Sequence, residues 1–420
     1  MRTSSPETNW GGNYTYRAEK IHRPSTVEQV QEIVARAPRV HALGTRHTFN
    51  DIGDSSELIN LQGLPPAVIV DRAAGTVSFS AGLAYGQLAE ALKAENVALH
   101  NLASLPHISV AGAVATATHG SGNTNGNLAT AVSALELVTS SGEIVTASRG
   151  DADFEGLVVG LGALGVVTRI TLEVEAAYQV RQRVFEGLAW EALYEHFDEI
   201  TASGYSVSVL TRWGAVADQV WVKSRVTDAP ELVRSDFFGA VAATVDRHPI
   251  LGVDPVNCSP QLGRPGPWFE RLPHFRMGFT PSLGEELQSE YLVPRAHAVA
   301  AIEAMRSLAE RIQPLLLVCE LRTVAADRLW MSGEYGRETM GIHFTWKPQQ
   351  EAVESLLVEI ETALAGLQAR PHWGKLFRTE AAAIAQLYER QPDFAALVAR
   401  LDPRGAFRNA WLDKYVLGKS

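Results

Sequence analysis

Hydrophobic residues fall at helical spacing in four segments, residues 26–37, 85–95, 296–312 and 350–369. The apolar positions of the first segment are Val27, Val30, Ile33 and Val34, which share one helical face. Ser25 and Glu28 have the spacing of a capping box, so we predict that this helix begins directly after Ser25. The other three segments predict amphipathic helices on the same grounds.

Short strand-like runs occupy most of the remaining first half, at residues 40–44, 67–70, 76–82, 134–148 and 168–175. Residues 134–148 predict a hairpin that turns at Ser140, Ser141 and Gly142. Residues 168–175, TRITLEVE, alternate strictly and predict a half-buried strand. Residues 1–177 are therefore predicted to form an α+β domain with few helices.

The pattern changes after residue 177. Strand-like runs at 207–213 and 219–224 precede a proline- and glycine-rich stretch, residues 259–275, whose aromatic side chains predict an ordered loop. The predicted order that follows is helix, strand, strand, helix, with the strands at 315–324 and 340–348. This order is typical of a separate sheet layered with helices, so residues 178–375 predict a second domain.

Composition narrows the class of protein. A chain of 420 residues is too long for one hydrophobic core, and a net charge of −10 without a basic run disfavours nucleic acid as a partner. Residues 1–12 lack the apolar core of a signal peptide, and the longest apolar run, 157–167, is too short to span a bilayer. With two cysteines in all, we expect a cytoplasmic protein that neither spans a membrane nor needs an obligate protein partner.

Two motifs suggest ligand binding. GLGALG at 160–165 fits the dinucleotide fingerprint, but a helix-like run precedes it and a strand follows it, which is the reverse of the required order. We therefore interpret it as a helix end and a turn. Residues 102–127 are rich in small residues, from which backbone N–H groups can approach an anion closely. The alternative is a surface loop, which the apolar set of Val110, Ala111, Val114 and Ala115 disfavours.

An ordered series of segments closely resembles one family, the flavoprotein oxidases of the vanillyl-alcohol oxidase fold, and within them the alditol oxidases. The segments are NWGGNYTY, LGTRHTFND, ASLPHISVAGAVATATHGSG, ALGVVT, PGPWFERLPHF, LQSEYLVPR, CELRTVAAD, HFTW, RPHWGK and DPRGAFRNA. The resemblance implies a two-domain α+β fold. Its FAD-binding domain, 1–177 completed by 376–420, has small sheets with helices, and its cap domain has an antiparallel sheet flanked by helices.

The resemblance also implies FAD joined covalently to His47, three residues after Gly44. Arg46 stands where many relatives have glycine, and Thr48 where many have serine. With no cysteine before Cys258, a second covalent link is not expected. The implied cofactor contacts are Gly44, Thr45, Arg46, His47, Thr48, Phe49, Ser104, Ser109, Val110, Ala111, Gly112, Thr116, Thr118, His119, Gly165 and Val167.

The second domain offers a polar cluster. Glu320 and Arg322 are two residues apart on one predicted strand, and His343 and Thr345 repeat this spacing on the next, so each pair shares a face. Lys375 adds an ammonium group. An inter-domain salt-bridge network would use the same residue types. The resemblance implies instead that these five residues, together with Ser104, line a polyol site.

Roles follow from charge. Arg322 and Lys375 can stabilise the oxygen that becomes negative as an alcohol is oxidised. Arginine stays protonated, so His343 or Lys375 is the candidate base. Glu320, Ser104 and Thr345 would hold the other hydroxyls, which favours polyols.

We therefore predict an oxidase that converts the terminal alcohol of xylitol or sorbitol to the aldose, transfers hydride to flavin N5 and reduces O2 to H2O2. An aldonolactone oxidase or dehydrogenase of the same fold is the alternative, and a non-catalytic flavin- or sugar-binding protein is a third hypothesis. No metal is expected, because the spacing of His41, His47, His100, His107 and His119 matches no standard site. No hydrolase elbow G-x-S-x-G occurs.

Overall fold

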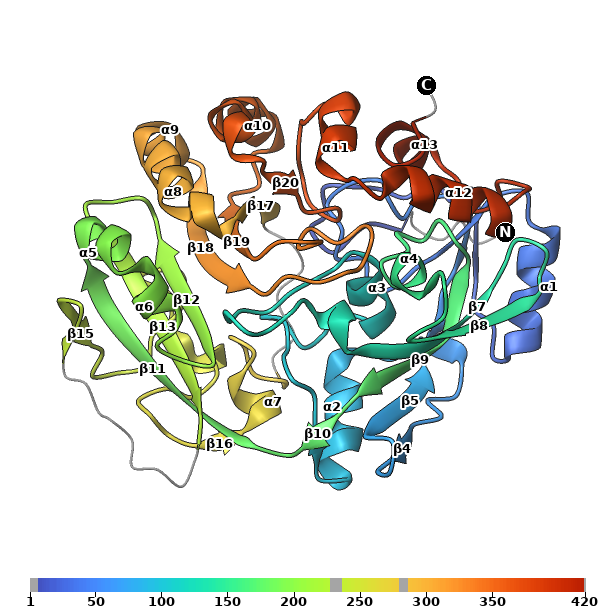
Figure 1. Ribbon diagram of the computed structural model, residues 1–420, viewed down its shortest axis with the longest axis horizontal. Coiled ribbons are helices and arrows are strands. Elements are labelled where there is room, and N and C mark those ends of the chain that lie inside the picture. The colour runs from blue at the N-terminus through green and yellow to red at the C-terminus, as the bar shows by residue number, and fades with distance from the viewer. Residues whose placement is uncertain (1–6, 227–235, 279–285, 419–420) are drawn as a thin grey trace.

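Two antiparallel sheets, each with its own helices, organise the chain (Figure 1). The computed structural model describes residues 7–226, 236–278 and 286–418. In the first half the five-stranded sheet has the order β4-β5-β9-β7-β8, and small sheets join β1-β3-β2 and β10-β6. The strands are β1 (Lys20–His22), β2 (Val40–Ala42), β3 (Glu57–Ile59), β4 (Ile69–Asp71), β5 (Thr76–Ser80), β6 (Val97–Ala98), β7 (Val132–Val138), β8 (Ile144–Ser148), β9 (Val166–Glu173) and β10 (Glu175–Ala176).

The helices of the first half are α1 (Val27–Arg36), α2 (Tyr85–Ala94), α3 (Val110–Ala115) and α4 (Phe154–Val158), with short 3-10 turns at Leu61–Gly63 and Leu128–Ala131. The predicted helices at α1 and α2 and the hairpin β7–β8 are confirmed. The capping-box prediction was wrong: Thr26 is the N-cap of α1 and accepts the N–H of Gln29, whose side chain accepts the N–H of Ser25. The cap thus lies one residue later than predicted.

The GLGALG segment lies between α4 and β9, so a helix precedes it and a strand follows it, as predicted. Gly162 and Gly165 have positive φ angles, which glycine adopts readily. A Cβ on Gly165 would lie 2.6 Å from the carbonyl oxygen of Val138 on β7. The glycines therefore serve a turn and a close backbone approach.

The second sheet has ten strands in the order β14-β15-β11-β13-β12-β18-β19-β17-β20, with β16 paired to β11. Its strands are β11 (Gln179–Leu188), β12 (Ser206–Thr211), β13 (Ala217–Arg225), β14 (Asp236–Phe237), β15 (Ala240–Ala242), β16 (Gly266–Pro267), β17 (Leu287–Pro294), β18 (Leu316–Val324), β19 (Thr339–Trp346) and β20 (Arg370–Pro371). Its helices are α5 (Trp190–Glu195), α6 (Phe197–Thr201), α7 (Trp268–Arg271), α8 (Ala298–Ser307), α9 (Ala309–Ile312) and α10 (Gln350–Leu364), with 3-10 turns at Pro255–Asn257, Arg295–His297 and Ala365–Leu367.

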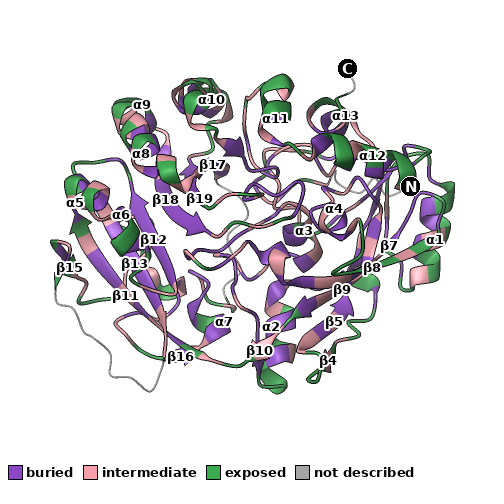
Figure 2. Ribbon diagram, viewed as in Figure 1, coloured by how far each residue is buried: buried purple, intermediate pink, exposed green. Residues whose placement is uncertain are grey.

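Helices cover one face of this sheet. Apolar residues of α5, α6, α8 and α10 form one buried cluster with inward residues of β12, β18 and β19, among them Phe344 and Trp346. In Figure 2 the central strands are buried, whereas α5 and α8 expose their outer sides. Because side chains alternate along a strand, the opposite face presents Glu320, Arg322, His343 and Thr345. The predicted pairing of these two strands is confirmed, but β11 and β17 were not predicted.

The end of the chain returns to the first half. The helices α11 (Ala381–Leu387), α12 (Gln391–Leu401) and α13 (Ala410–Tyr415) contribute Ile384, Phe394 and Leu412 to the same hydrophobic cluster as the five-stranded sheet. This packing agrees with a first domain completed by 376–420. The boundaries at residues 177 and 375 stay a prediction.

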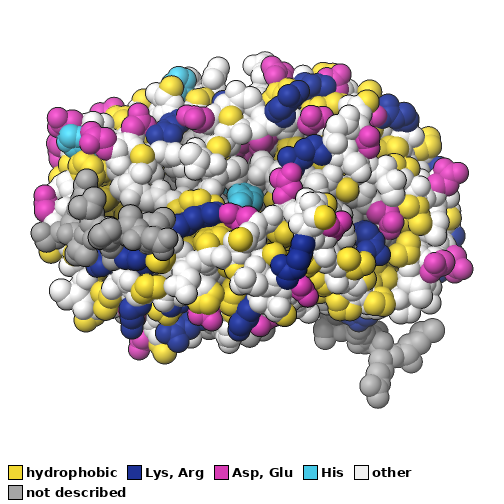
Figure 3. Space-filling view, turned by 60° about the horizontal axis from the view of Figure 1, so that its bottom comes forward, with side chains coloured by type: hydrophobic (Ala, Val, Ile, Leu, Met, Phe, Trp, Pro, Cys, Tyr) yellow, Lys and Arg dark blue, Asp and Glu magenta, His cyan; other side chains and the backbone are white. Residues whose placement is uncertain are grey.

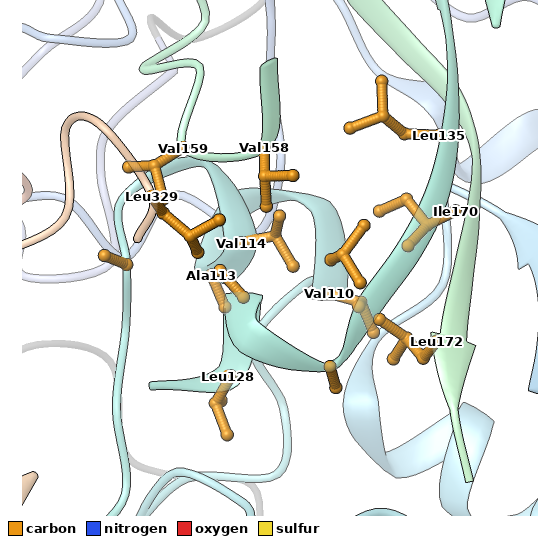
Figure 4. Close-up of a cluster of buried hydrophobic side chains, with 14 of the residues drawn as sticks. Val110, Ala113, Val114, Leu128, Leu135, Val158, Val159, Ile170, Leu172 and Leu329 are labelled. Carbon is orange, nitrogen blue, oxygen red and sulfur yellow. The ribbon is translucent and has the colours of Figure 1, made fainter. Parts of the chain in front are cut away.

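The glycine-rich segment 102–127 contains the six-residue helix α3, which the sequence did not predict. Figure 4 shows Val110, Ala113 and Val114 pointing into the cluster that Leu135 and Ile170 of the sheet line. The apolar positions of this segment therefore have helical spacing, and they anchor the surrounding backbone to the core.

Candidate active site

A cavity of about 1090 Å³ runs from the loop around His47 and α3 to β18 and β19. All the site residues predicted from the sequence line this cavity except Val110. The Val110 side chain is fully buried in the core, and its N–H donates to the carbonyl of Leu83. The expected contact of Val110 with a cofactor stays a prediction.

His47 lies in the loop after β2, with its ring against the cavity. Its Nδ1 lies 3.1 Å from the Thr45 hydroxyl oxygen, which also accepts the N–H of Ser109 at 2.9 Å. Trp10 stacks on the imidazole, with the ring centroids 5.1 Å apart and the planes inclined by 19°. These contacts fix the orientation of the ring.

The other nitrogen of His47, Nε2, is buried and has no hydrogen-bond partner among the described residues. Burial lowers the pKa of His47 to about 4, so the ring is neutral near pH 7 and keeps a lone pair. A buried polar atom without a hydrogen-bond partner destabilises a protein unless a bound ligand contacts that atom. A group covalently bound at this nitrogen accounts for that atom.

The N-terminal residues hold this loop in place. Arg46 has φ = 63°, the left-handed region that favours glycine, and its guanidinium pairs with Glu7. The N–H of Trp10 donates to the carbonyl of Arg46 at 2.7 Å. Phe49 donates its N–H to the carbonyl of Gly374, which ties the His47 loop to the segment that carries Lys375.

The walls near His47 leave no room for larger residues. A Cβ on Gly44 would lie 2.4 Å from the hydroxyl oxygen of Ser109, and one on Gly112 would lie 2.7 Å from the same atom. Thr116, Thr118 and the remaining predicted contacts except Val110 line the same cavity. A long cavity with small-residue walls, into which His47 brings a neutral imidazole with an unpaired Nε2, fits FAD.

The charged cluster lies at the other end of the cavity. Glu320 is paired in register with His343 on the adjacent strand. Arg322 Nη2 lies 3.2 Å from Glu290 Oε1, and Arg322 Nε lies 3.7 Å from Glu320 Oε1. Burial alone would raise the pKa of each carboxyl, but the surrounding cations and histidines hold both well below the usual range. Both carboxylates are therefore ionised near neutral pH.

Lys375 and His343 form a close pair. Lys375 Nζ lies 2.5 Å from both His343 Nδ1 and Glu290 Oε2, and His343 Nε2 lies 3.3 Å from the Thr345 hydroxyl oxygen. Burial and then Lys375 lower the pKa of His343 to about 4. Burial also lowers the pKa of Lys375, while Glu290 raises it. His343 is thus neutral and accepts a hydrogen bond from Lys375 through Nδ1.

Glu290 on β17 is the centre of the cluster, and sequence reasoning missed it. It is 1% exposed and contacts Arg322, His343 and Lys375, while His119 Nε2 lies 2.9 Å from its Oε1. A lone carboxylate inside the apolar strand LQSEYLVP was the available signal, because glutamate is rarely buried unless it is paired. His274 and Lys223, which lie behind Glu320, were missed as well.

The cluster is more than a salt-bridge network between domains. Arg322 Nε is buried and has no hydrogen-bond partner within the described ranges, so this guanidinium keeps donor capacity beside the cavity. The carbonyl of Thr323 accepts the N–H of Gly122, which places the glycine-rich segment directly against β18. A backbone hydrogen bond therefore joins the two segments that line the cavity.

Other classes of site find no support in the described part of the chain. There, no group of three or more His, Cys, Asp or Glu side chains is arranged to hold a metal ion. No helix in the described ranges has the length and apolarity needed to cross a bilayer. Acidic and basic side chains are interspersed on the face that Figure 3 shows.

Comparison with known proteins agrees with this geometry. Residues 18–148 match the family model of an FAD binding domain, and residues 280–415 match that of D-arabinono-1,4-lactone oxidase. An alditol oxidase from a Streptomyces species is 48% identical over 414 residues, which cover 97% of this chain and 98% of that protein.

More distant proteins share the fold. The L-gulono-1,4-lactone dehydrogenase of Mycobacterium tuberculosis is 28% identical over 98% of this chain and 99% of that protein. The crystal structure of cholesterol oxidase from B. sterolicum matches with a TM-score of 0.78 at 15% identity, over 98% of this chain and 96% of that chain. The expected two-domain α+β architecture of the vanillyl-alcohol oxidase type and the FAD cofactor are thereby confirmed. Because the 48% identity spans both proteins almost end to end, the chain belongs to the alditol oxidase family of FAD-dependent oxidoreductases.

Proposed function

We propose that the protein oxidises the terminal primary alcohol of alditols such as xylitol and sorbitol to the aldose and reduces O2 to H2O2. The observation that carries this proposal is the buried cluster of Glu320, Arg322, His343 and Lys375 in the same cavity as His47. The similarity to an alditol oxidase supports the choice of substrate. Residues 1–177 with 376–420 hold FAD, and residues 178–375, together with Ser104, hold the polyol.

The cofactor is bound at the small-residue end of the cavity. His47 forms the covalent bond to it, because its unpaired buried nitrogen is the neutral nucleophile there. The remaining predicted cofactor contacts, apart from Val110, surround it. When bound, FAD supplies the acceptor for the hydride and passes the electrons to oxygen.

The cations stabilise the reacting oxygen. As the alcohol loses hydride and a proton, negative charge develops on its oxygen, and fixed positive groups lower the energy of that state. Arg322 and Lys375 are such groups, and both are held by Glu290 before substrate binds. The alcohol proton goes to Lys375 in the form of the enzyme in which this lysine is neutral, and the ammonium so formed stabilises the oxygen while it donates to His343.

Hydroxyl recognition gives specificity. Glu320, Thr345 and Ser104 line the cavity and bind the hydroxyls that do not react. A substrate without these hydroxyls leaves buried polar groups unpaired, which costs about 1–3 kcal/mol for each group. Polyols are therefore preferred over simple alcohols.

A second candidate function is oxidation of an aldonolactone. The match of residues 280–415 to the D-arabinono-1,4-lactone oxidase family model favours it. A lactone ring offers fewer hydroxyl donors to Glu320 than an open polyol does. We rank it second for that reason.

Peroxide formation tests the proposal. The purified protein is assayed in air with xylitol, sorbitol and L-gulono-1,4-lactone, and then without oxygen with a dye acceptor. We expect peroxide from the polyols, and bleaching of the flavin when they are added anaerobically. Turnover of the lactone without turnover of any polyol would reject the proposal, and a flavin that no polyol bleaches would indicate a non-catalytic binding protein.

Localisation in the cytoplasm and action without an obligate protein partner belong to the same proposal. Both cysteines, Cys258 and Cys319, are free and buried, which suits a reducing compartment. Fractionation of cells with an antibody to the protein, and its mass in solution, test the two statements.

A further inference from the structure

A second row of buried polar groups lies behind Glu320. His274 Nε2 lies 2.8 Å from Glu320 Oε1, and His274 Nδ1 lies 3.0 Å from Nζ of Lys223 on β13. Lys223 also donates to the carbonyl of Leu272. Lys223 is 1% exposed and His274 is 6% exposed, so this row is almost wholly buried.

When the row carries one positive charge, its hydrogen-bonding chemistry allows two arrangements. A protonated lysine only donates, so His274 Nδ1 must accept and Nε2 must carry the proton that reaches Glu320. If the proton moves from Lys223 to His274, the imidazole is doubly protonated and Nε2 still donates. In both arrangements the two residues hold one positive charge and aim an N–H at Glu320 Oε1.

The geometry points to Lys223 and His274 as positioning residues, which hold Glu320 ionised and oriented to accept a hydroxyl of the polyol remote from the oxidised carbon. This inference rests on the proposed function and deepens it. In the part of the chain that the structure describes, His274 and Arg322 both meet Oε1 of Glu320. The other carboxylate oxygen is then available to a hydroxyl in the cavity.

Burial supports this role. A charged lysine this deep in the sheet is strongly destabilising unless it is paired. Burial lowers the pKa of Lys223 to about 7, and it also lowers the pKa of His274. The two residues therefore share a single proton, and that proton gives the row its one positive charge. The backbone N–H of His274 donates to the backbone carbonyl of Ser104. The loop that carries His274 therefore contacts both proposed hydroxyl-binding residues, Glu320 and Ser104.

The test combines enzyme variants with substrate analogues. His274→Phe keeps the ring volume without the N–H, His274→Gln keeps an amide donor, and Lys223→Met removes the charge behind the imidazole. The matched control is Ser259→Ala, because Ser259 is buried in the same region and its hydroxyl donates to the backbone carbonyls of Pro273 and His274, not to the side chains of the row. Flavin retained in the acid-precipitated protein verifies that each variant is folded.

Steady-state kinetics are measured with xylitol and with its mono-deoxy analogues. For His274→Phe and Lys223→Met we expect the KM of xylitol to rise about 10- to 100-fold, with kcat changed less than about threefold. The analogue that lacks the hydroxyl bound by Glu320 reacts poorly with the native enzyme, and its disadvantage relative to xylitol shrinks about tenfold in these variants. His274→Gln recovers part of the KM effect, and Ser259→Ala leaves KM unchanged.

Several results would overturn the inference. These are an unchanged pattern across the analogues, an equal loss of kcat for every substrate, or the same KM change in Ser259→Ala. If His274→Phe loses its flavin, Lys223→Met and His274→Gln carry the comparison. Failure of the native enzyme to oxidise xylitol refutes the proposed function itself, which separates that outcome from a flat pattern in an active enzyme.

Discussion

Glu290→Gln is the sharpest perturbation of the cluster. Glutamine has nearly the same shape as glutamate but no charge, so Arg322 and Lys375 lose their shared partner while the cavity keeps its volume. Breaking a buried ion pair by removing one partner costs about 3–5 kcal/mol. At about 2 °C per kcal/mol for a large domain, the thermal midpoint should fall by roughly 6–10 °C.

The same change alters the pH dependence. The carboxylate of Glu290 raises the pKa of Lys375 against the lowering effect of burial, and it also raises that of His343. Without Glu290 the Lys375–His343 pair binds its protons less tightly. In the profile of kcat/KM against pH, the limb that reports this pair should therefore move to lower pH. The value of kcat should fall about 10²- to 10³-fold, which is typical when an enzyme loses one preorganised group that stabilises the transition state.

The assay is peroxide release with xylitol from pH 5 to 10, alongside thermal unfolding. Glu361→Gln is the control, because the Glu361 carboxylate accepts the hydroxyl of Tyr291, the neighbour of Glu290, on the opposite face of the sheet. The control should lose stability without any movement of the pH profile. A Glu290→Gln enzyme with native kcat and an unmoved profile would refute the reasoning about charge.

Three further changes test other parts of the molecule. Trp10→Ala removes the ring that stacks on His47, so covalent attachment of FAD should slow about 2- to 10-fold. The rate is measured as the flavin retained in acid-precipitated protein over time, and equal rates in the variant and the native protein would contradict the role of the stack. Burial and the carboxylate of Glu334 raise the pKa of Asp327 to about 7. The free energy of unfolding should therefore fall by about 1.4 kcal/mol for each unit that the pH rises between 4 and 7, and Asp327→Asn should remove this slope in urea unfolding. Gly165→Ala should destabilise by about 1–3 kcal/mol in urea unfolding, because the new Cβ meets β7 at 2.6 Å and φ is 152°; an unchanged midpoint would contradict the close packing.

Local patterns predicted much of the fold. The period of apolar residues identified α1, α2, α8 and α10, and strict alternation identified β9. Strand β17 escaped because nearly all its residues are buried, which removes the alternation of polar and apolar positions that marks a half-buried strand. Helix α3 escaped because a six-residue helix of small residues has little periodicity.

The site divides in the same way. Glu320 with Arg322 and His343 with Thr345 were predictable, since residues two apart on a strand share a face whatever the neighbouring strands are. Glu290, His274 and Lys223 enter the site only through the order of the strands, because β17 lies beside β19 and β13 lies two strands from β18. No local pattern states which strands become neighbours, so these three residues could not be assigned from sequence spacing.

The residues that the structure adds decide the charge of the site. The predicted set holds one carboxylate, Glu320, against the cations Arg322 and Lys375, and Glu290 then neutralises that excess charge. The Lys223–His274 pair restores one positive charge from behind Glu320. With two carboxylates and three positive charges, the resting cavity keeps a modest positive potential. A neutral polyol gains little from this potential when it binds. The potential becomes favourable only when negative charge grows on the reacting oxygen. Binding energy is thus reserved for the transition state rather than for the ground state.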